Sequence, residues 1–178
     1  ESVAKPLFRL LEETYGIPEE NVVFSGTHTH AGPVMYSRNP VFPKVPEFLD
    51  TMFAPEMLRI TEEAIRDLTP ATVFIGRGKT EGLNFVRRYI SKKDGSFLGN
   101  WPKEILDPEE AMHESEVDEE MQVVRFVREG KKDILMVNFQ AHAAMAGDVG
   151  WFIISPDWIG HMRNDLERDT EMHVAYFN

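Results

Sequence analysis

Two histidines stand one residue apart shortly after an apolar run. The run is VVF at residues 22–24, and small residues lead from it to His28 and His30. A third histidine, His142, follows a second apolar run, ILMVNF at residues 134–139. A buried strand has no need of imidazoles, and a surface turn seldom needs two. The spacing therefore indicates a metal site or an acid–base pair.

Imidazole nitrogens are ordinary zinc ligands, and a catalytic zinc site leaves one coordination position for water. Water bound there ionises near neutral pH and supplies a nucleophile. The chain has no cysteine, so a transition metal must be held by His, Asp, Glu or Tyr. Residues i and i+2 of a strand project to the same side about 7 Å apart. Either one of His28 and His30 binds the metal while the other faces the substrate, or both bind it.

Apolar spacing predicts the elements that position these histidines in the first half of the chain. The pattern predicts a helix over residues 3–15, a short buried strand over residues 21–25 and an irregular loop over residues 29–45. A further helix is expected over residues 46–68, with Pro55 kinking or dividing it because proline lacks the N–H that a helix needs.

Strand patterns dominate the second half. We expect a strand at 71–76 and another at 83–90, the second closed by a turn at 93–96, and then a surface excursion at 99–118. A hairpin of 121–128 with 133–139, a helix at 156–168 capped by Ser155 or Asp157, and a strand at 173–177 should follow. This order indicates an α/β fold, a mixed β-sheet with flanking helices. If the strands before His28 and His142 run parallel, all three imidazoles meet at their carboxyl ends.

Composition excludes some classes of protein. With 178 residues, 42% of them hydrophobic and 28% charged, the chain should fold around a real core as one domain or most of one. The net charge of −11 argues against a nucleic-acid partner, whose phosphates it would repel. No apolar run approaches the ~18 residues of a membrane span, so no transmembrane segment is expected.

The stretch SGTHTHAGP resembles the His-Thr-His-Ser-Gly-Pro signature of the neutral/alkaline non-lysosomal ceramidase family. The resemblance continues at GIPEENVVFSGTHTH, LNFVRRYISKKDGS, VNFQAHA and ISPDWIGHMRNDLE, and so covers most of residues 5–178. Members of this family are zinc-dependent amidases that cleave the N-acyl bond of ceramide into a fatty acid and a sphingoid base. The resemblance implies a Zn²⁺-dependent amide hydrolase with a lipid-like N-acyl substrate, and it suggests a secreted or extracellular protein.

The resemblance also implies roles for individual residues. His28 and His142 would be zinc ligands, with ring nitrogens within about 5 Å of each other. His30 would be a catalytic residue that contacts the substrate. Arg87, or less favourably Arg88, would be a charged donor that orients a polar head group or stabilises an oxyanion. The 29–45 loop would form one wall of an apolar groove, through Val34, Met35, Tyr36, Val41 and Phe42.

The chain departs from the family pattern in several places. Ala31 stands where the family commonly has Ser, and Ala143 where it has Pro. The family places its remaining zinc ligands, a Glu and a Tyr, and a proposed catalytic Ser further downstream than these motifs. We therefore expect residues 1–178 to be a single domain or a fragment of a ceramidase-like catalytic domain, and the isolated chain to be inactive.

Two other classes remain as alternatives. Another metallohydrolase is one: amidohydrolase barrels also place His-X-His at a strand end, but they need further strands and ligands. The metallo-β-lactamase pattern requires an Asp two residues after the second histidine, where Gly32 stands here. The other alternative is a non-catalytic binding or structural module in which the histidines are vestigial.

Overall fold

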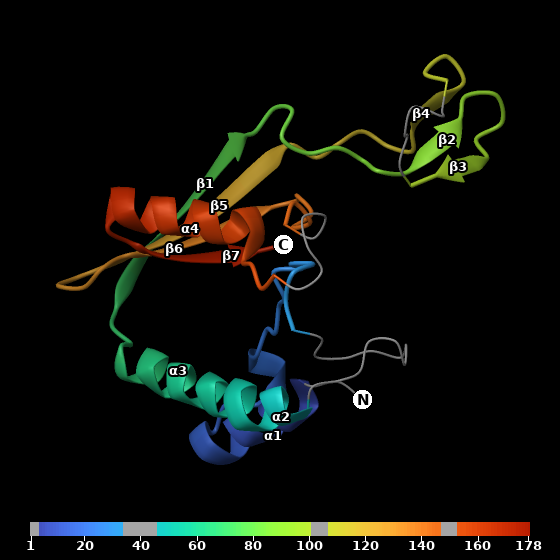
Figure 1. The fold of residues 1–178 in the computed structure, drawn as a ribbon. Coiled ribbons are helices and arrows are strands. Elements are labelled where there is room, and N and C mark those ends of the chain that lie inside the picture. The colour runs from blue at the N-terminus through green and yellow to red at the C-terminus, as the bar shows by residue number, and fades with distance from the viewer. Residues whose placement is uncertain (1–3, 34–45, 101–106, 147–152) are drawn as a thin grey trace.

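The computed structural model describes residues 4–33, 46–100, 107–146 and 153–178 (Figure 1). Its centre is a four-stranded sheet in the order β1-β5-β6-β7. Strand β5 is antiparallel to both of its neighbours, β1 and β6, whereas β6 and β7 are parallel. This is the mixed sheet that the sequence predicts. The strand bounds are β1 Ala71–Lys79, β5 Glu120–Arg128, β6 Ile134–Phe139 and β7 His173–Phe177.

The predicted hairpin is confirmed as β5 and β6. Their register pairs Met121 with Phe139 and Phe126 with Ile134. Gly130 lies in the turn at φ 70°, a backbone conformation that glycine adopts without steric cost. The chain then passes from β6 to β7 through helix α4 (Asp157–Thr170), because parallel neighbours need a crossover connection.

Helix α4 packs on the sheet and closes the main core (Figure 1). The ring of Trp158 lies 5.3 Å from that of Tyr176 and 6.4 Å from that of Phe139, in edge-to-face geometry. Burying apolar surface here stabilises β6, the strand that leads to His142. The most buried members of this core are Val137, Phe139, Ile159 and Val174, each at most 7% exposed.

A group of helices forms a second layer. Leu7 and Leu11 are buried on one face of α1 (Ala4–Tyr15), and Gly16 at φ 66° ends that helix. The helix expected around Pro55 is present as α2 (Pro46–Phe48), a π-helical turn η2 (Leu49–Phe53) and α3 (Ala54–Arg66). The irregular turn precedes Pro55 because proline cannot donate to the preceding turn.

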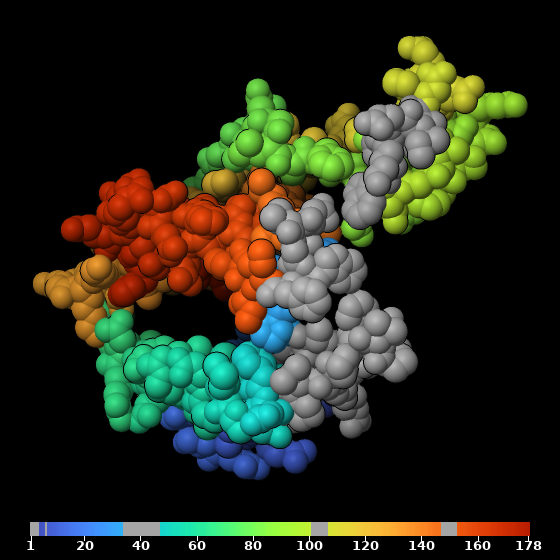
Figure 2. Space-filling model, in the orientation of Figure 1, coloured from blue at the N-terminus to red at the C-terminus, as the bar shows by residue number. Residues whose placement is uncertain are grey.

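The helical layer stands apart from the sheet. Figure 2 shows an opening between α3 and α4. Part of the apolar surface of the sheet is uncovered, since Ile75 of β1 is 76% exposed. One link between the layers is Asp67, at the end of α3, which pairs with Arg128 and with Lys131, the latter at 2.8 Å. These two cations lower the pKa of Asp67 to about 2. Among the described helices, none is both long and apolar enough to cross a membrane.

A small sheet projects from the large one (Figure 1). It consists of β2 (Tyr89–Ser91) between β3 (Phe97–Gly99) and β4 (Ala111–His113). The predicted turn at 93–96 is confirmed, with the Ser91 N–H donating to the Ser96 carbonyl at 2.8 Å. Part of the expected surface excursion, residues 101–106, lies outside the described residues.

The strand predicted over residues 83–90 is wrong for residues 83–88. These residues form no ladder; they connect the two sheets as an extended link. The side chain of Asn84 holds the link in place by donating to the carbonyls of Asp118 at 2.7 Å and Gln140 at 2.8 Å. Bonds from one side chain replace the backbone pairing that a strand requires.

The buried strand predicted over residues 21–25 is also wrong. Asn21 closes a short 3₁₀ turn, η1 (Glu19–Asn21), and residues 22–29 are irregular. Val23 is 83% exposed and Phe24 is 41% exposed. A strand needs a neighbour for its backbone hydrogen bonds, and none of the described residues pairs with this segment. Its apolar composition alone does not make a strand.

Candidate metal centre

The structure brings His28, His30 and His142 together. One ring nitrogen from each lies within 4.8 Å of the others, which agrees with the expected separation. The ring centroids are 4.5 Å apart for His30 and His142, 4.7 Å for His28 and His142, and 5.3 Å for His28 and His30. All three side chains are exposed. Within the described part of the chain this is the one such group of potential ligands.

The route to this convergence differs from the predicted one. His142 follows the end of β6 by three residues, as expected, but His28 and His30 belong to an irregular segment (Figure 1). The His30 N–H donates to the carbonyl of Ala143 at 3.2 Å, which joins the two segments directly. His28 has a φ of 62°, a left-handed conformation that is uncommon outside glycine. A tight bend, rather than a strand end, turns the first pair of rings toward His142.

Two of the rings share a hydrogen bond. Nε2 of His142 and Nε2 of His30 are 2.8 Å apart, so one nitrogen donates a proton and the other accepts it. The pKa of His142 is lowered, first because surrounding protein removes water from the ring, and then because His30, His28 and Arg87 add positive charge. Asp157 acts in the opposite direction. The neutral imidazole that results is the form that binds metals.

The donor set fits zinc. Imidazole suits Zn²⁺, which binds nitrogen at about 2.0–2.1 Å, so two ligands on one ion lie about 3–4 Å apart. The 2.8 Å contact and the 4.8 Å limit bracket that range. Small rotations of exposed rings would therefore suffice for three imidazoles to share one ion.

Thr29, between the two histidines, ties their segment to the chain before α4. Its hydroxyl donates to the Ser155 carbonyl at 2.8 Å and accepts the Ala31 N–H at 3.2 Å. The Ser155 N–H donates in return to the Ala31 carbonyl at 2.9 Å. Sequence reasoning singled out the histidines and missed Thr29; its place inside the motif is the only local signal.

Asp157 occupies the start of α4, where Ser155 or Asp157 was expected to cap the helix. Pro156 takes the cap position and makes no side-chain cap bond, so that prediction is wrong in detail. Ser155 instead accepts the Asp157 N–H through its hydroxyl at 3.1 Å. Asp157 is 1% exposed, and its carboxylate accepts the N–H groups of Trp158 at 2.7 Å and Ala146 at 2.8 Å. The residue pattern around Asp157 in the sequence does not predict that this carboxylate is buried.

The two candidate arginines separate in space. Arg88 forms an ion pair at 2.8 Å with Glu114, which directly follows β4, and lies 5.1 Å over the ring of Phe97 in β3. Arg87 is exposed and lies near enough to His142 to lower the pKa of that ring. Of the two, Arg87 is therefore the one whose charge reaches the histidine cluster.

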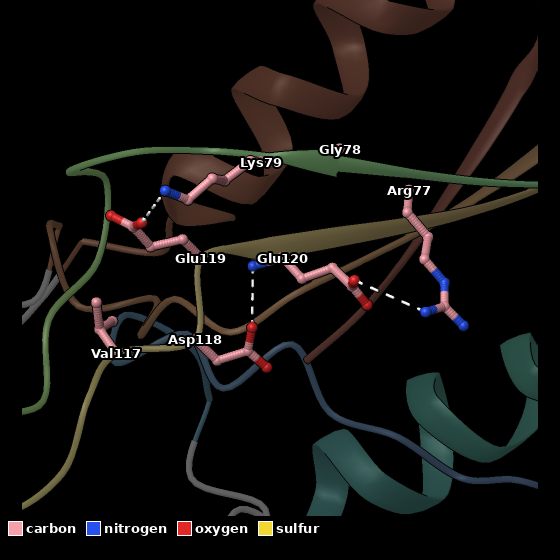
Figure 3. Close-up of a pocket in the computed structure, with 7 residues that line it drawn as sticks. All are labelled: Arg77, Gly78, Lys79, Val117, Asp118, Glu119 and Glu120. Atoms are coloured by element: carbon pink, nitrogen blue, oxygen red, sulfur yellow. Dashed lines mark hydrogen bonds and ion pairs between the residues drawn. The ribbon is translucent and has the colours of Figure 1, made fainter.

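A surface pocket of about 460 Å³ lies elsewhere, at the start of β5 (Figure 3). Within it Lys79 pairs with Glu119 at 3.3 Å and Arg77 with Glu120 at 3.8 Å. These charges neutralise one another, and no histidine of the cluster lines the pocket. Its lining residues are Arg77, Gly78, Lys79, Val117, Asp118, Glu119 and Glu120. The expected groove residues at 34–42 fall outside the described residues, so that expectation stays a prediction.

Comparison with known proteins defines the class to which this fold and site belong. The model of the neutral/alkaline non-lysosomal ceramidase family, N-terminal part, matches residues 1–175. The chain therefore belongs to this family, as its motifs suggest.

One known relative is the neutral ceramidase of Pseudomonas aeruginosa strain PAO1. It is 26% identical to the chain over 193 aligned residues. The alignment takes in 97% of the chain but 25% of that protein, so the chain spans about a quarter of its relative's length.

Proposed function

We propose that this chain carries the zinc-binding centre of an amide hydrolase that cleaves the N-acyl bond of ceramide. The observation that carries the proposal is the meeting of three imidazoles from motifs that are 112 residues apart in the chain. Membership of the ceramidase family supports both the hydrolytic chemistry and the lipid substrate. That residues 1–178 are one domain or part of a larger catalytic domain stays a prediction.

In this proposal His28 and His142 hold the ion. Zinc, when bound, polarises a carbonyl and lowers the pKa of water. His30 is hydrogen-bonded to His142 in the present structure, and it would exchange a proton with the reacting amide. Arg87 would supply a charged donor to the oxyanion or to the polar head group. The exposure of all three rings leaves a face open to a substrate.

Exposed apolar side chains flank the cluster along the chain. Met145 is 73% exposed and follows His142 by three residues. Ile153 and Ile154, at 52% and 80% exposed, directly precede Ser155, which bonds to the His28–His30 segment. Exposed apolar groups beside a polar reaction centre suit a substrate with a long acyl chain. These three residues would contact that chain.

The test is zinc binding by the 178-residue chain, measured by calorimetry, together with ceramide hydrolysis by the product of its gene. His28→Ala and His142→Ala should each weaken zinc binding by more than about 100-fold, beyond the 10- to 100-fold typical of outer-shell changes. His30→Ala should retain zinc and lower turnover. His161→Ala, an exposed histidine on α4, is the matched control and should change neither.

Each outcome separates one class of protein from another. Failure of the unaltered chain to bind zinc would contradict the proposal. Zinc binding by a gene product that hydrolyses no ceramide would favour a binding module or a different metallohydrolase. Equal loss of zinc in all three variants would make His30 a third ligand and remove its separate role. We expect the 178-residue chain alone to bind zinc without turnover, because within its described part no carboxylate joins the three imidazoles.

A further inference from the structure

Residues 155–158, at the start of α4, contact both segments that carry the histidines. The first contact runs from Thr29 and Ala31 to the backbone of Ser155. The second runs from the carboxylate of Asp157 to the backbone of Ala146, four residues after His142. The start of α4 therefore forms hydrogen bonds with both histidine segments, which lie far apart in the chain.

The bonds to the segment that carries His28 and His30 are made by Thr29, the residue between these two histidines. The hydroxyl of Thr29 donates at 2.8 Å to Ser155 and accepts at 3.2 Å from Ala31, so it fixes the backbone on both sides of His30. The neighbouring His28 is held at φ 62°. A non-glycine residue stays in this conformation only when its surroundings determine it, and such strain gathers at functional sites.

The bonds to the segment that carries His142 involve a buried carboxylate, that of Asp157. Asp157 is 1% exposed, and no cation among the described residues pairs with it. A role confined to the helix start would need only its bond to Trp158. The bond to Ala146 reaches out of the helix to the segment after His142, and the indole of Trp158 adds a donor to the His142 carbonyl at 3.4 Å. Asp157 is also left-handed, at φ 56°.

We propose that Thr29 and Asp157 are positioning residues that hold the two histidine segments against the start of α4 and so set the spacing of the three rings. In this proposal neither side chain contacts the substrate. Thr29 acts through its bond to the Ala31 N–H, and Asp157 acts through its bond to the Ala146 N–H. The measurement of zinc affinity depends on the proposed function, because it requires that the histidines bind zinc. The spacing of the rings without metal is an independent readout.

The test compares near-isosteric substitutions in the 178-residue chain. Thr29→Val removes the hydroxyl and keeps the shape, whereas Thr29→Ser keeps the hydroxyl. Asp157→Asn keeps the shape and tolerates a positive φ, but its amide nitrogen cannot accept a hydrogen bond. Asp165→Asn, on the exposed face of α4, is the control for losing a carboxylate. Val174→Ala, in the core at β7, controls for general loss of stability.

Two measurements decide the outcome. In the metal-free chain, Thr29→Val and Asp157→Asn should shift the ring ¹⁵N and ¹H NMR signals of the three histidines, and Thr29→Ser and both controls should not. Zinc affinity should fall about 10- to 100-fold in the first two variants, the range found for groups that orient metal ligands. Thermal unfolding shows whether each variant is folded.

Unchanged ring signals and zinc affinity within twofold of the original chain in Thr29→Val would overturn the proposal. An equal fall in zinc affinity in Val174→Ala would reduce the role to ordinary stability and overturn it as well. If Asp157→Asn does not fold, the comparison of Thr29→Val with Thr29→Ser still tests the proposal. If the unaltered chain binds no zinc, the proposed function fails, and the NMR signals of the metal-free chain decide the positioning roles separately.

Discussion

The two segments that carry the histidines have similar sequences and different structures. Residues 134–142 are an apolar run that forms β6, hydrogen-bonded to β5 on one side and β7 on the other, before reaching His142. Residues 22–30 begin with an apolar run at 22–24 that forms no strand and leaves Val23 83% exposed. One histidine is thus placed by a sheet, and the other two are placed by a bend and a few long-range hydrogen bonds.

The difference shows what an apolar run requires before it becomes a strand. β6 lies inside the sheet, where both of its edges are paired, Val137 and Phe139 are buried, and Trp158 of α4 contacts Phe139. The run before His28 has no neighbouring strand among the described residues, so its backbone gains nothing from extension. Substitutions in the two segments should therefore affect the stability of the protein differently.

The largest contrast is expected between two phenylalanines at corresponding places. Phe139→Ala in β6 should destabilise the fold by about 3–5 kcal/mol, because it empties a site that is 3% exposed. Phe24→Ala should cost about 1 kcal/mol, because this ring is 41% exposed and makes edge contacts with Phe8 and Phe53. Urea unfolding of both variants measures the difference. Equal losses would mean that the two segments are equally built into the core.

A smaller contrast is expected at the backbone of the two segments. His28→Asn should be more stable than His28→Ala by about 1 kcal/mol, because asparagine tolerates the left-handed conformation at φ 62° better than alanine. The same pair of changes at His142, which has no positive φ, should show no such preference. Thermal unfolding without zinc is the measurement. A matching preference at both positions would remove the strained bend from the explanation.

The smallest effect is expected in acid, at the hairpin end of the sheet. Lys131 and Arg128 lower the pKa of Asp67 from 3.8 to about 2, so its pairing stabilises the folded chain fully above pH 3.8 and is lost as the pH falls through about 2. Asp67→Asn should therefore make the stability curve flatter between those two pH values. Urea unfolding at a series of pH values checks this.

Lys131→Gln provides the matched control for that experiment. Removing this cation should produce part of the same flattening, and adding Asp67→Asn to it should then change the slope less than in the original chain. An unaltered slope in Asp67→Asn would show that other carboxylates determine the acid sensitivity of the sheet.

Much of the framework could be predicted from residue patterns. The β5–β6 hairpin follows from two apolar runs around Gly130, and β7 from the short run after α4. The Gly16 end of α1 and the irregularity before Pro55 follow from the conformational limits of glycine and proline. These features depend on residues close together in the chain, which is why local spacing predicts them.

The sequence by itself determined that His28, His30 and His142 were the residues to consider, and its motifs indicated the family. Only the tertiary structure decided how they meet, that the charge of Arg87 acts on His142 while Arg88 pairs with Glu114, and that Thr29 and Asp157 bond to the backbone of residues 155 and 146. The physical reason is that these relations depend on hydrogen bonds and charges between residues up to 126 positions apart, as from Thr29 to Ser155. Whether an apolar run becomes a strand likewise depends on the neighbour that the fold places beside it.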